Sequence, residues 1–289
     1  MCTIDPDNDS PLLYEWDFQS DGTVDSNLEN PSFTYTTSGD FQAQLRVSDG
    51  NGGVGVKNIT INAGNNAATF VFNSPPDGGL IGWGDEINLN LEVSDVEDGT
   101  TAGNGIDCND VNIVPSLGHL NHFHDDLTLS GCPQSARLAY EGHDIYGEMD
   151  IYYVLNTNYE DTGGLTSFDQ IQLHPKRKEA EYYDMQSDTE IIANTDTWEG
   201  GTSSVRGDHG GYIVLEGRNL LNITGVKYRV SAASLGGNIE LRTGSPTGPL
   251  LATTAVPVTG GTSIWTDVQS TFTDPGGKND LYFVFTGSV

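Results

Sequence analysis

Short apolar stretches in which every second residue is polar run along most of the chain. The pattern is clear in LLYEWDF, FQAQLRVSD and VGVKNITINAG, which begin at residues 12, 41 and 54. Alternation with a period of two places apolar side chains on one face of a β-strand. Gly, Asn, Asp, Thr and Ser separate these stretches, as is typical of tight turns. The pattern therefore predicts an all-β chain.

The length and the turn-rich breaks predict three tandem β-sandwich modules. The chain has 289 residues, and small β-modules run to about 100 residues each. A Gly-Asn-Asn run that begins at residue 64 ends the first group of strands, and the polar run KRKEAEYYD opens the last group. We place the modules at residues 1–64, 65–175 and 176–289. A hydrophobic content of 36% with aromatic residues spread along the chain excludes a disordered composition.

The formal net charge is −29, because 12 Lys and Arg residues stand against 41 Asp and Glu residues. A surface of this sign repels phosphate backbones and anionic membranes, which excludes nucleic acid as the main partner. No apolar run is long enough to cross a membrane, so membrane insertion is not expected. Cations screen and bridge carboxylates in a salty, Ca²⁺-containing medium. The charge therefore predicts a secreted protein that is extracellular or bound to the cell surface.

Three cysteines occur, and two of them, Cys108 and Cys132, bracket a histidine-rich stretch. A disulfide between these two would suit a secreted protein. Cys2 is left over, either as a free thiol or with a partner upstream. No pair of cysteines has zinc-finger spacing, so that class of site has no support.

The stretch LGHLNHFHDD, from residue 117 to residue 126, holds three of the six histidines. His122 and His124 would share one face of a strand, and His119 could reach them from the preceding turn. His143 is a candidate fourth ligand. Imidazole nitrogens favour zinc or copper, so the sequence predicts a transition-metal site here. The alternative is that these histidines bond to backbone groups or line the surface.

Three runs in the first module carry a family resemblance: YEWDF at residues 14–18, PSFTY at 31–35 and GDFQAQLRVSD at 39–49. Together they resemble a PKD domain, which is an immunoglobulin-like sandwich. Gln19 and Phe33 depart from the Gly and His of that family. The family also has strands before the acidic DPD turn, so we expect this module to be incomplete at its N-terminus.

The second module has the runs SPPDGG at residues 74–79 and SDVEDG at 94–99, which resemble bacterial Ig-like modules. With the histidine-rich stretch, it is similar to segments of large secreted bacterial proteins that carry sugar-dehydrogenase-like propellers and polysaccharide-binding modules. This resemblance implies a polysaccharide context and no particular reaction.

The third module contains GGYIVLEG from residue 210, GNIELR from 237, TGG from 259 and LYFVFTG from 281. Their order and spacing resemble a family 6 carbohydrate-binding module, which is a β-sandwich or jelly roll. The resemblance implies a structural calcium at Glu179 and Glu181, since two carboxylates on one face of a strand repel unless a cation lies between them. The alternative is a pair of solvated glutamates. The family's last-strand acidic residue is missing, so we expect the module to be incomplete at its C-terminus.

The family resemblance also implies a sugar-binding site, for which the candidates are Glu190, Trp198, Arg206 and Tyr212. Carbohydrate modules stack a pyranose ring on aromatic faces. In the place of the family's first main aromatic residue this chain has Arg206 or a glycine, and in the place of the second it has Thr262, so binding is either unusual or lost. An arginine in the site would suit a uronic or sulfated sugar.

These observations predict a non-catalytic carbohydrate-binding and spacer region, with any catalytic domain outside this chain. Polysaccharide is the expected partner. One alternative is a structural or adhesive filament subunit in which neighbouring copies supply missing edge strands. A second alternative is a metal-dependent enzyme that uses the histidines, although no general base or nucleophile is identifiable by spacing.

Overall fold

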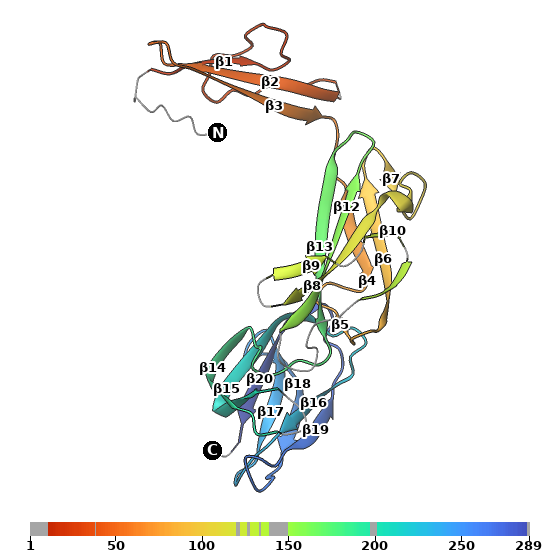
Figure 1. The fold of residues 1–289 in the computed structure, drawn as a ribbon, viewed down its shortest axis with the longest axis vertical. Helices are drawn as coiled ribbons and strands as arrows, with labels where there is room; N and C mark the ends of the chain where they lie inside the picture. The colour runs from red at the N-terminus through yellow and green to blue at the C-terminus, as the bar shows by residue number, and fades with distance from the viewer. Residues whose placement is uncertain are drawn as a thin grey trace. The chain divides into compact units, whose positions relative to one another are not determined.

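The computed structural model describes residues 11–37, 39–119, 122–125, 128–132, 134–138, 150–196 and 201–287. These residues form twenty β-strands, one short 3₁₀-helix and no α-helix (Figure 1). The predicted all-β fold is therefore confirmed. Within the described ranges no helix could cross a membrane.

The first module is an antiparallel sheet of three strands in the order β1-β2-β3. The strands are β1 (Leu13–Asp17), β2 (Gly39–Ser48) and β3 (Val54–Ala63). All three coincide with the alternating stretches of the sequence. Five aromatic side chains form a row of ring contacts, with successive centroids 5.6, 4.5, 5.0 and 4.2 Å apart, from Trp16 through Phe18, Phe33 and Tyr35 to Phe41.

Aspartates in this module support turns. The Asp17 carboxylate accepts the backbone N–H of Gly22 at 2.8 Å and that of Asp21 at 3.2 Å. Asp21 in turn accepts the N–H of Thr23 at 2.8 Å. Such bonds replace backbone partners that a tight turn lacks.

The segment that follows the first sheet is held by hydrogen bonds. Asn65 Nδ2 donates to Asp161 Oδ1 at 3.0 Å, and the N–H of Ala68 donates to Ser167 Oγ at 2.9 Å. The first module therefore forms one compact unit with the turns Ser94–Gly99 and Glu160–Ser167, and the rest of the chain forms a second compact unit. The predicted linker is packed against these two turns.

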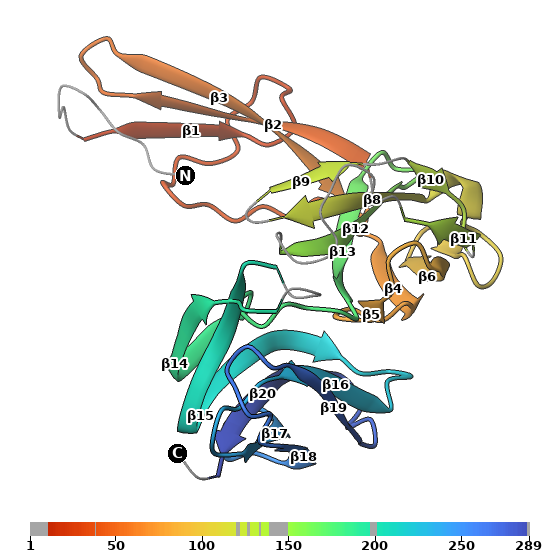
Figure 2. The same cartoon turned by 60° about the horizontal axis from the view of Figure 1, so that its bottom comes forward.

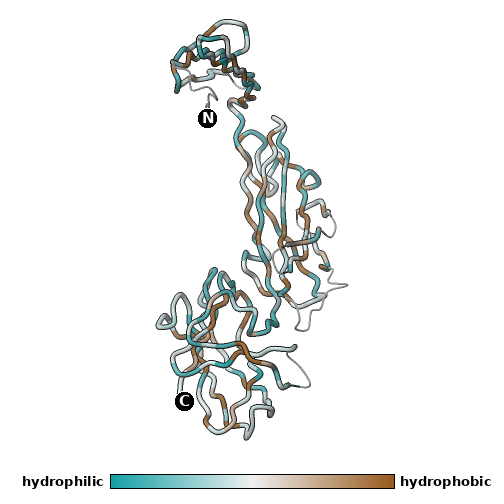
Figure 3. Tube along the Cα trace, turned by 60° about the vertical axis from the view of Figure 1, so that its left-hand side comes forward, coloured by the Kyte–Doolittle hydropathy of each residue, from teal (hydrophilic) through white to brown (hydrophobic). Residues whose placement is uncertain are grey.

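The second module contains two sheets, and its hydrophobic residues alternate with polar ones along the strands (Figure 3). Along β6, Leu89, Leu91 and Val93 are at most 2% exposed. The first sheet has the order β10-β8-β12-β13-β5, with β9 also paired to β8, and consists of β5 (Leu80–Ile81), β8 (Asn112–His119), β9 (His122–Asp125), β10 (Leu129–Ser130), β12 (Ile151–Glu160) and β13 (Thr166–Pro175). The second has the order β11-β6-β4, with β7 paired to β6, and consists of β4 (Thr69–Ser74), β6 (Glu86–Asp95), β7 (Gly99–Thr100) and β11 (Gln134–Arg137).

The 3₁₀-helix η1 (Cys108–Asp110) precedes β8, and Cys132 follows β10. Cys108 and Cys132 form a disulfide with a Cα–Cα distance of 5.2 Å. The disulfide closes the segment that contains the histidine-rich hairpin. Within this segment β10 pairs with β8.

The third module is a sandwich in which a two-stranded sheet covers a five-stranded sheet (Figure 2). Leu220, Leu241, Ala252 and Leu281 form a buried core cluster, against which Val226 of the smaller sheet packs. The larger sheet has the order β14-β15-β20-β17-β18, with β14 (Met185–Ala193), β15 (Ser203–Asn219), β17 (Gly237–Thr243), β18 (Leu250–Val256) and β20 (Lys278–Thr286). The smaller sheet consists of β16 (Gly225–Val230) and β19 (Thr266–Thr271).

The second and third modules share a packed boundary, and both belong to the second compact unit. Leu80 of β5 packs against the core cluster of the third module. The N–H of Asn219 donates to the carbonyl of Gly78 at 2.9 Å, and Lys278 Nζ lies 2.5 Å from Asp77 Oδ2. The predicted boundary at residues 175 and 176 therefore lies between two modules that contribute to one core.

Two buried basic side chains meet at this boundary. Arg218 is 5% exposed and His174 is 8% exposed. Arg218 Nη1 lies 3.1 Å from His174 Nε2, and Arg218 Nη2 pairs with Asp184 Oδ2 at 3.2 Å. Arginine can only donate, so His174 Nε2 must accept and its imidazole is neutral. Burial, followed by the nearby charge of Arg218, lowers the pKa of His174 to about 3.

Candidate functional site

One face of the five-stranded sheet carries two neighbouring tyrosines. Tyr212 on β15 lies opposite Val284, and Tyr282 on β20 lies opposite Val214, so the four side chains share one face of the sheet. The tyrosine ring centroids are 5.5 Å apart at an interplanar angle of 51°. Val214 is fully buried and Val284 is 6% exposed, whereas both tyrosines keep part of their surface exposed. The two valines are therefore the buried part of this face, and the two tyrosines are its partly exposed part.

Strand β17 continues this face with an ion pair. Glu240 lies opposite Val284, and Arg242 lies opposite Tyr282. Arg242 Nε donates to Glu240 Oε2 at 2.8 Å, and Arg242 Nη1 donates to the carbonyl of Gly248 at 2.7 Å. About a fifth of each charged side chain is exposed. We call the surface made by Tyr212, Tyr282, Glu240 and Arg242 the tyrosine face.

The opposite side of β20 points into the sandwich. Phe283 contacts the ring of Tyr228 on β16 edge to face, with centroids 6.1 Å apart. Burial raises the pKa of Tyr228, which agrees with its interior position. Since side chains alternate along a strand, Tyr282 points outward. The tyrosine face therefore lies on the side of the sheet that points away from the sandwich interior, and its polar side chains are partly exposed.

The chemistry of the tyrosine face suits a ligand that has both an apolar side and hydroxyl groups. The aromatic rings offer electron-rich faces for C–H groups. Glu240 can accept hydrogen bonds and Arg242 can donate them, and their mutual bond fixes both side chains. A sugar ring presents these two kinds of surface at once.

Glu190 and Arg206, two of the predicted sugar-binding residues, form an ion pair with each other. They lie directly opposite across β14 and β15, and Arg206 Nη2 contacts Glu190 Oε1. Both side chains are more than half exposed. This pairing was not predicted, and it neutralises the arginine that was expected to attract an acidic sugar. The third candidate, Trp198, lies outside the described residues.

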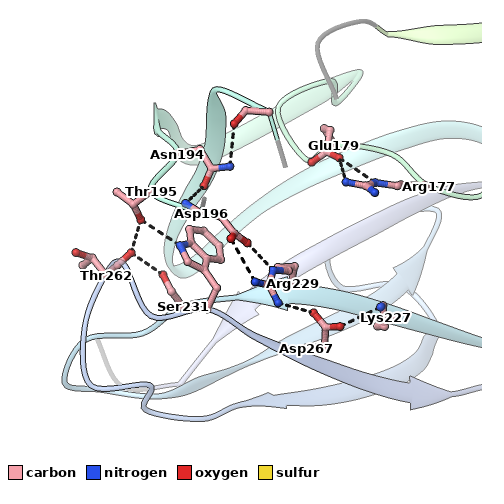
Figure 4. A network of polar contacts seen from close by, with 12 residues as sticks. Arg177, Glu179, Asn194, Thr195, Asp196, Lys227, Arg229, Ser231, Thr262 and Asp267 are labelled. Carbon is pink, nitrogen blue, oxygen red and sulfur yellow. Dashed lines mark hydrogen bonds and ion pairs between the residues drawn. The ribbon is translucent and has the colours of Figure 1, made fainter. Parts of the chain in front are cut away.

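Hydrogen bonds join three loops at one end of the third module (Figure 4). Thr195 Oγ1 and Ser231 Oγ both donate to the carbonyl of Thr262, at 2.7 and 3.2 Å. Trp265 Nε1 donates to Thr195 Oγ1 at 3.1 Å. Thr262, which was predicted to replace a family aromatic residue, joins these loops through its backbone carbonyl. The side chain of Trp265 is only partly buried, and its indole N–H reaches a loop hydroxyl.

A row of ion pairs lies beside these loops (Figure 4). The Asp196 carboxylate is 3% exposed and pairs with Arg229, whose Nη1 also donates to Asp267 Oδ1 at 3.2 Å. Lys227 Nζ donates to Asp267 Oδ2 at 3.0 Å. Hydrogen bonds from Lys227 and Arg229 lower the pKa of Asp267. These ion pairs hold the side chains beside the loops in place and make this end of the module polar.

Glu179 and Glu181, the predicted calcium ligands, lie in a turn before β14. The expectation that they share one face of a strand is wrong, because the N–H of Tyr182 donates to the carbonyl of Glu179 at 3.2 Å and closes a turn. The Glu179 carboxylate pairs with Arg177 at 3.2 Å (Figure 4). Calcium at this turn stays a prediction, with carboxylate and carbonyl oxygens as the groups that could hold it.

Of the predicted histidine ligands, the structure brings His119 and His124 together. Their Nε2 atoms are 3.2 Å apart. His119 lies at the end of β8 and not in a turn, because its backbone pairs with both β9 and β12. His143 and the side chain of His122 lie outside the described residues. Among the residues that the structure describes, no group of three or more His, Cys, Asp or Glu is placed to hold a metal.

Comparison with known families agrees with the resemblances. The family model for the carbohydrate binding module (family 6) matches residues 179–289, and the model for the PKD domain matches residues 2–63. Both suspected modules are confirmed, in the predicted order.

Two curated relatives are arabinoxylan arabinofuranohydrolases. The protein from Paenibacillus polymyxa is 32% identical over 125 residues, and the match covers 38% of this chain and 20% of that protein. The protein from Bacillus subtilis (strain 168) is 40% identical over 57 residues, which cover 20% of this chain and 11% of that protein. The chain thus spans a fifth or less of the curated relatives it matches.

Solved structures similar to this chain include two family 6 modules. One, from Clostridium cellulolyticum in complex with xylose, is 35% identical and covers 38% of this chain and 84% of its own, with a TM-score of 0.35. Another, a β-1,3-glucan binding module from Bacillus halodurans, is 34% identical and covers 38% of this chain and 81% of its own, with a TM-score of 0.36.

Proposed function

We propose that this chain, which carries a PKD domain and a family 6 carbohydrate-binding module, is a non-catalytic carbohydrate-binding and spacer region of a secreted bacterial protein. The observation that carries the proposal is the tyrosine face. Its two tyrosine rings are neighbours and partly exposed, the valines beside them are buried, and its flanking charged side chains are hydrogen-bonded. A preformed face of this kind loses little freedom when it binds a sugar chain.

The tyrosine face is a better binding surface than the Glu190 and Arg206 pair. An exposed ion pair offers no aromatic ring, and its charges satisfy each other. The face on β15, β20 and β17 keeps two rings and two charged side chains within neighbouring rows of one sheet. We therefore place sugar binding at Tyr212 and Tyr282.

A neutral, β-linked plant polysaccharide is the proposed ligand. The curated relatives are arabinoxylan arabinofuranohydrolases, so arabinoxylan is the first polysaccharide to test. The net charge of −29 also disfavours acidic polymers, since like charges repel. We propose that catalysis belongs to other parts of the parent protein, and that secretion brings the chain to its polymer.

Substitution of Tyr212 by alanine is expected to weaken arabinoxylan binding by about tenfold or more, because the ring that stacks on the sugar is lost. Tyr282→Ala is expected to act in the same direction. The measurement is retardation of the full chain in native gels that contain soluble arabinoxylan, compared with gels that contain β-1,3-glucan or no polymer.

Two matched variants locate the site. Phe168→Ala removes an aromatic ring that is 73% exposed elsewhere on the second compact unit, and it should leave retardation unchanged. Arg206→Ala tests the exposed ion pair. If Arg206→Ala abolishes retardation while Tyr212→Ala does not, the tyrosine face is not the site. If no polymer retards the unaltered chain, with or without Ca²⁺, the binding function is wrong.

A further inference from the structure

We infer that the hairpin of β8 and β9 holds an exchangeable Zn²⁺ site formed by the Nε2 atoms of His119 and His124. The two nitrogens are 3.2 Å apart, and the ring centroids are 5.2 Å apart at an interplanar angle of 30°. Both imidazoles therefore direct the same ring nitrogen toward one point in space. This site is independent of the sugar-binding module.

The distance between the two nitrogens fits a tetrahedral ion. Zinc binds histidine nitrogen at about 2.0–2.1 Å, and two tetrahedral ligands at that distance lie about 3.3 Å apart. Two adjacent corners of a square-planar Cu²⁺ complex with similar bond lengths would lie closer, at about 2.9 Å. The 3.2 Å separation between the two Nε2 atoms is close to the tetrahedral value.

The backbone holds the two histidines at this distance. β8 lies between β9 and β12, so His119 pairs with Ile151 on one side, while Leu117 pairs with His124 on the other. Ile151 and Leu117 are both at most 5% exposed. Gly118, which lies between Leu117 and His119 in β8, packs under the ring of Tyr152. A Cβ added at Gly118 would lie 2.3 Å from that ring. The hairpin is therefore anchored to the sheet, and its geometry is set before an ion arrives.

The environment admits an ion from solvent. His124 is exposed and His119 is partly exposed, so water can complete the coordination shell, as it does at open zinc sites. The net charge of −29 raises the local concentration of cations. Without an ion, one imidazole donates an N–H to the other. With Zn²⁺ bound, both Nε2 atoms give lone pairs and each ring carries its proton on Nδ1.

Isothermal titration of the untagged, metal-free full chain with ZnCl₂ tests the site. The expected result is one Zn²⁺ per chain, with affinity reduced by about tenfold or more in both His119→Ala and His124→Ala, since each loses one of two ligands. His209→Ala is the matched control, because His209 is an exposed histidine on β15 far along the chain from the hairpin. Its affinity should equal that of the unaltered chain.

A second measurement keeps the test decisive if a variant fails to fold. Zn²⁺ should shift the imidazole nitrogen signals of His119 and His124 in NMR spectra of the unaltered chain, with the largest change at Nε2. No heat of binding, unchanged affinity in both hairpin variants, or zinc-dependent shifts confined to other histidines would each overturn the proposal.

Discussion

Acidification from pH 7 to pH 5 is expected to lower the unfolding free energy of the second compact unit by about 2 kcal/mol. The cause is His174, which is buried at the boundary between the second and third modules. Its Nε2 faces an arginine N–H at 3.1 Å, so the folded protein has no place for a second imidazole proton.

The sign of this effect follows from the two pKa values. The pKa of His174 is lowered to about 3 in the folded protein, against about 6.5 in an unfolded chain. Between these values the unfolded chain binds a proton that the folded chain does not. The contribution of His174 to the unfolding free energy is therefore complete above about pH 6.5. It falls by about 1.4 kcal/mol for each pH unit below that value, until the folded imidazole also takes up a proton near pH 3.

Urea unfolding between pH 7 and pH 5 measures this slope. His174→Gln is the matched variant, because its side-chain oxygen can still accept from Arg218 and it does not titrate. The variant should lose most of the pH dependence in this range, where Asp and Glu have little influence. Equal slopes in the two proteins would show that folding does not lower the pKa of His174.

Loss of the disulfide is expected to lower the unfolding free energy by about 3 kcal/mol. Cys108 and Cys132 are 24 positions apart, and a crosslink across such a segment restricts the unfolded chain substantially. Cys132→Ser should therefore unfold at a lower urea concentration than the unaltered protein. Cys2→Ser controls for the change of a thiol to a hydroxyl and should leave the midpoint unchanged.

The same disulfide should hold in place the strand β8, which pairs with β9 in the histidine-rich hairpin. β10 pairs with β8 at Ile113 and Asn112, and Cys132 follows directly after β10. Reduction of the unaltered chain should reproduce the stability loss of Cys132→Ser. If reduction has no effect on the midpoint, the crosslink does not contribute to stability.

The sequence predicted only part of the candidate site. Tyr212, Glu190 and Arg206 were found from motif positions, but Tyr282, Glu240 and Arg242 were not. A signal for them was present, because GNIELR and LYFVFTG alternate with a period of two. Alternation tells which residues share a face of one strand, but it does not tell which strands are neighbours. Only the pairing of β15 with β20 and of β20 with β17 brought these residues together.

The sequence by itself determined the all-β class, the two recognisable modules and the strands of the first module, because alternation and turn residues act over a few neighbouring positions. The tertiary structure decided the partners of charged and titratable groups. It paired Arg206 with Glu190, placed Arg218 against His174, and set His119 beside His124. These contacts join residues on different strands. Strand pairing and burial set their distances, and no local pattern in the chain encodes them.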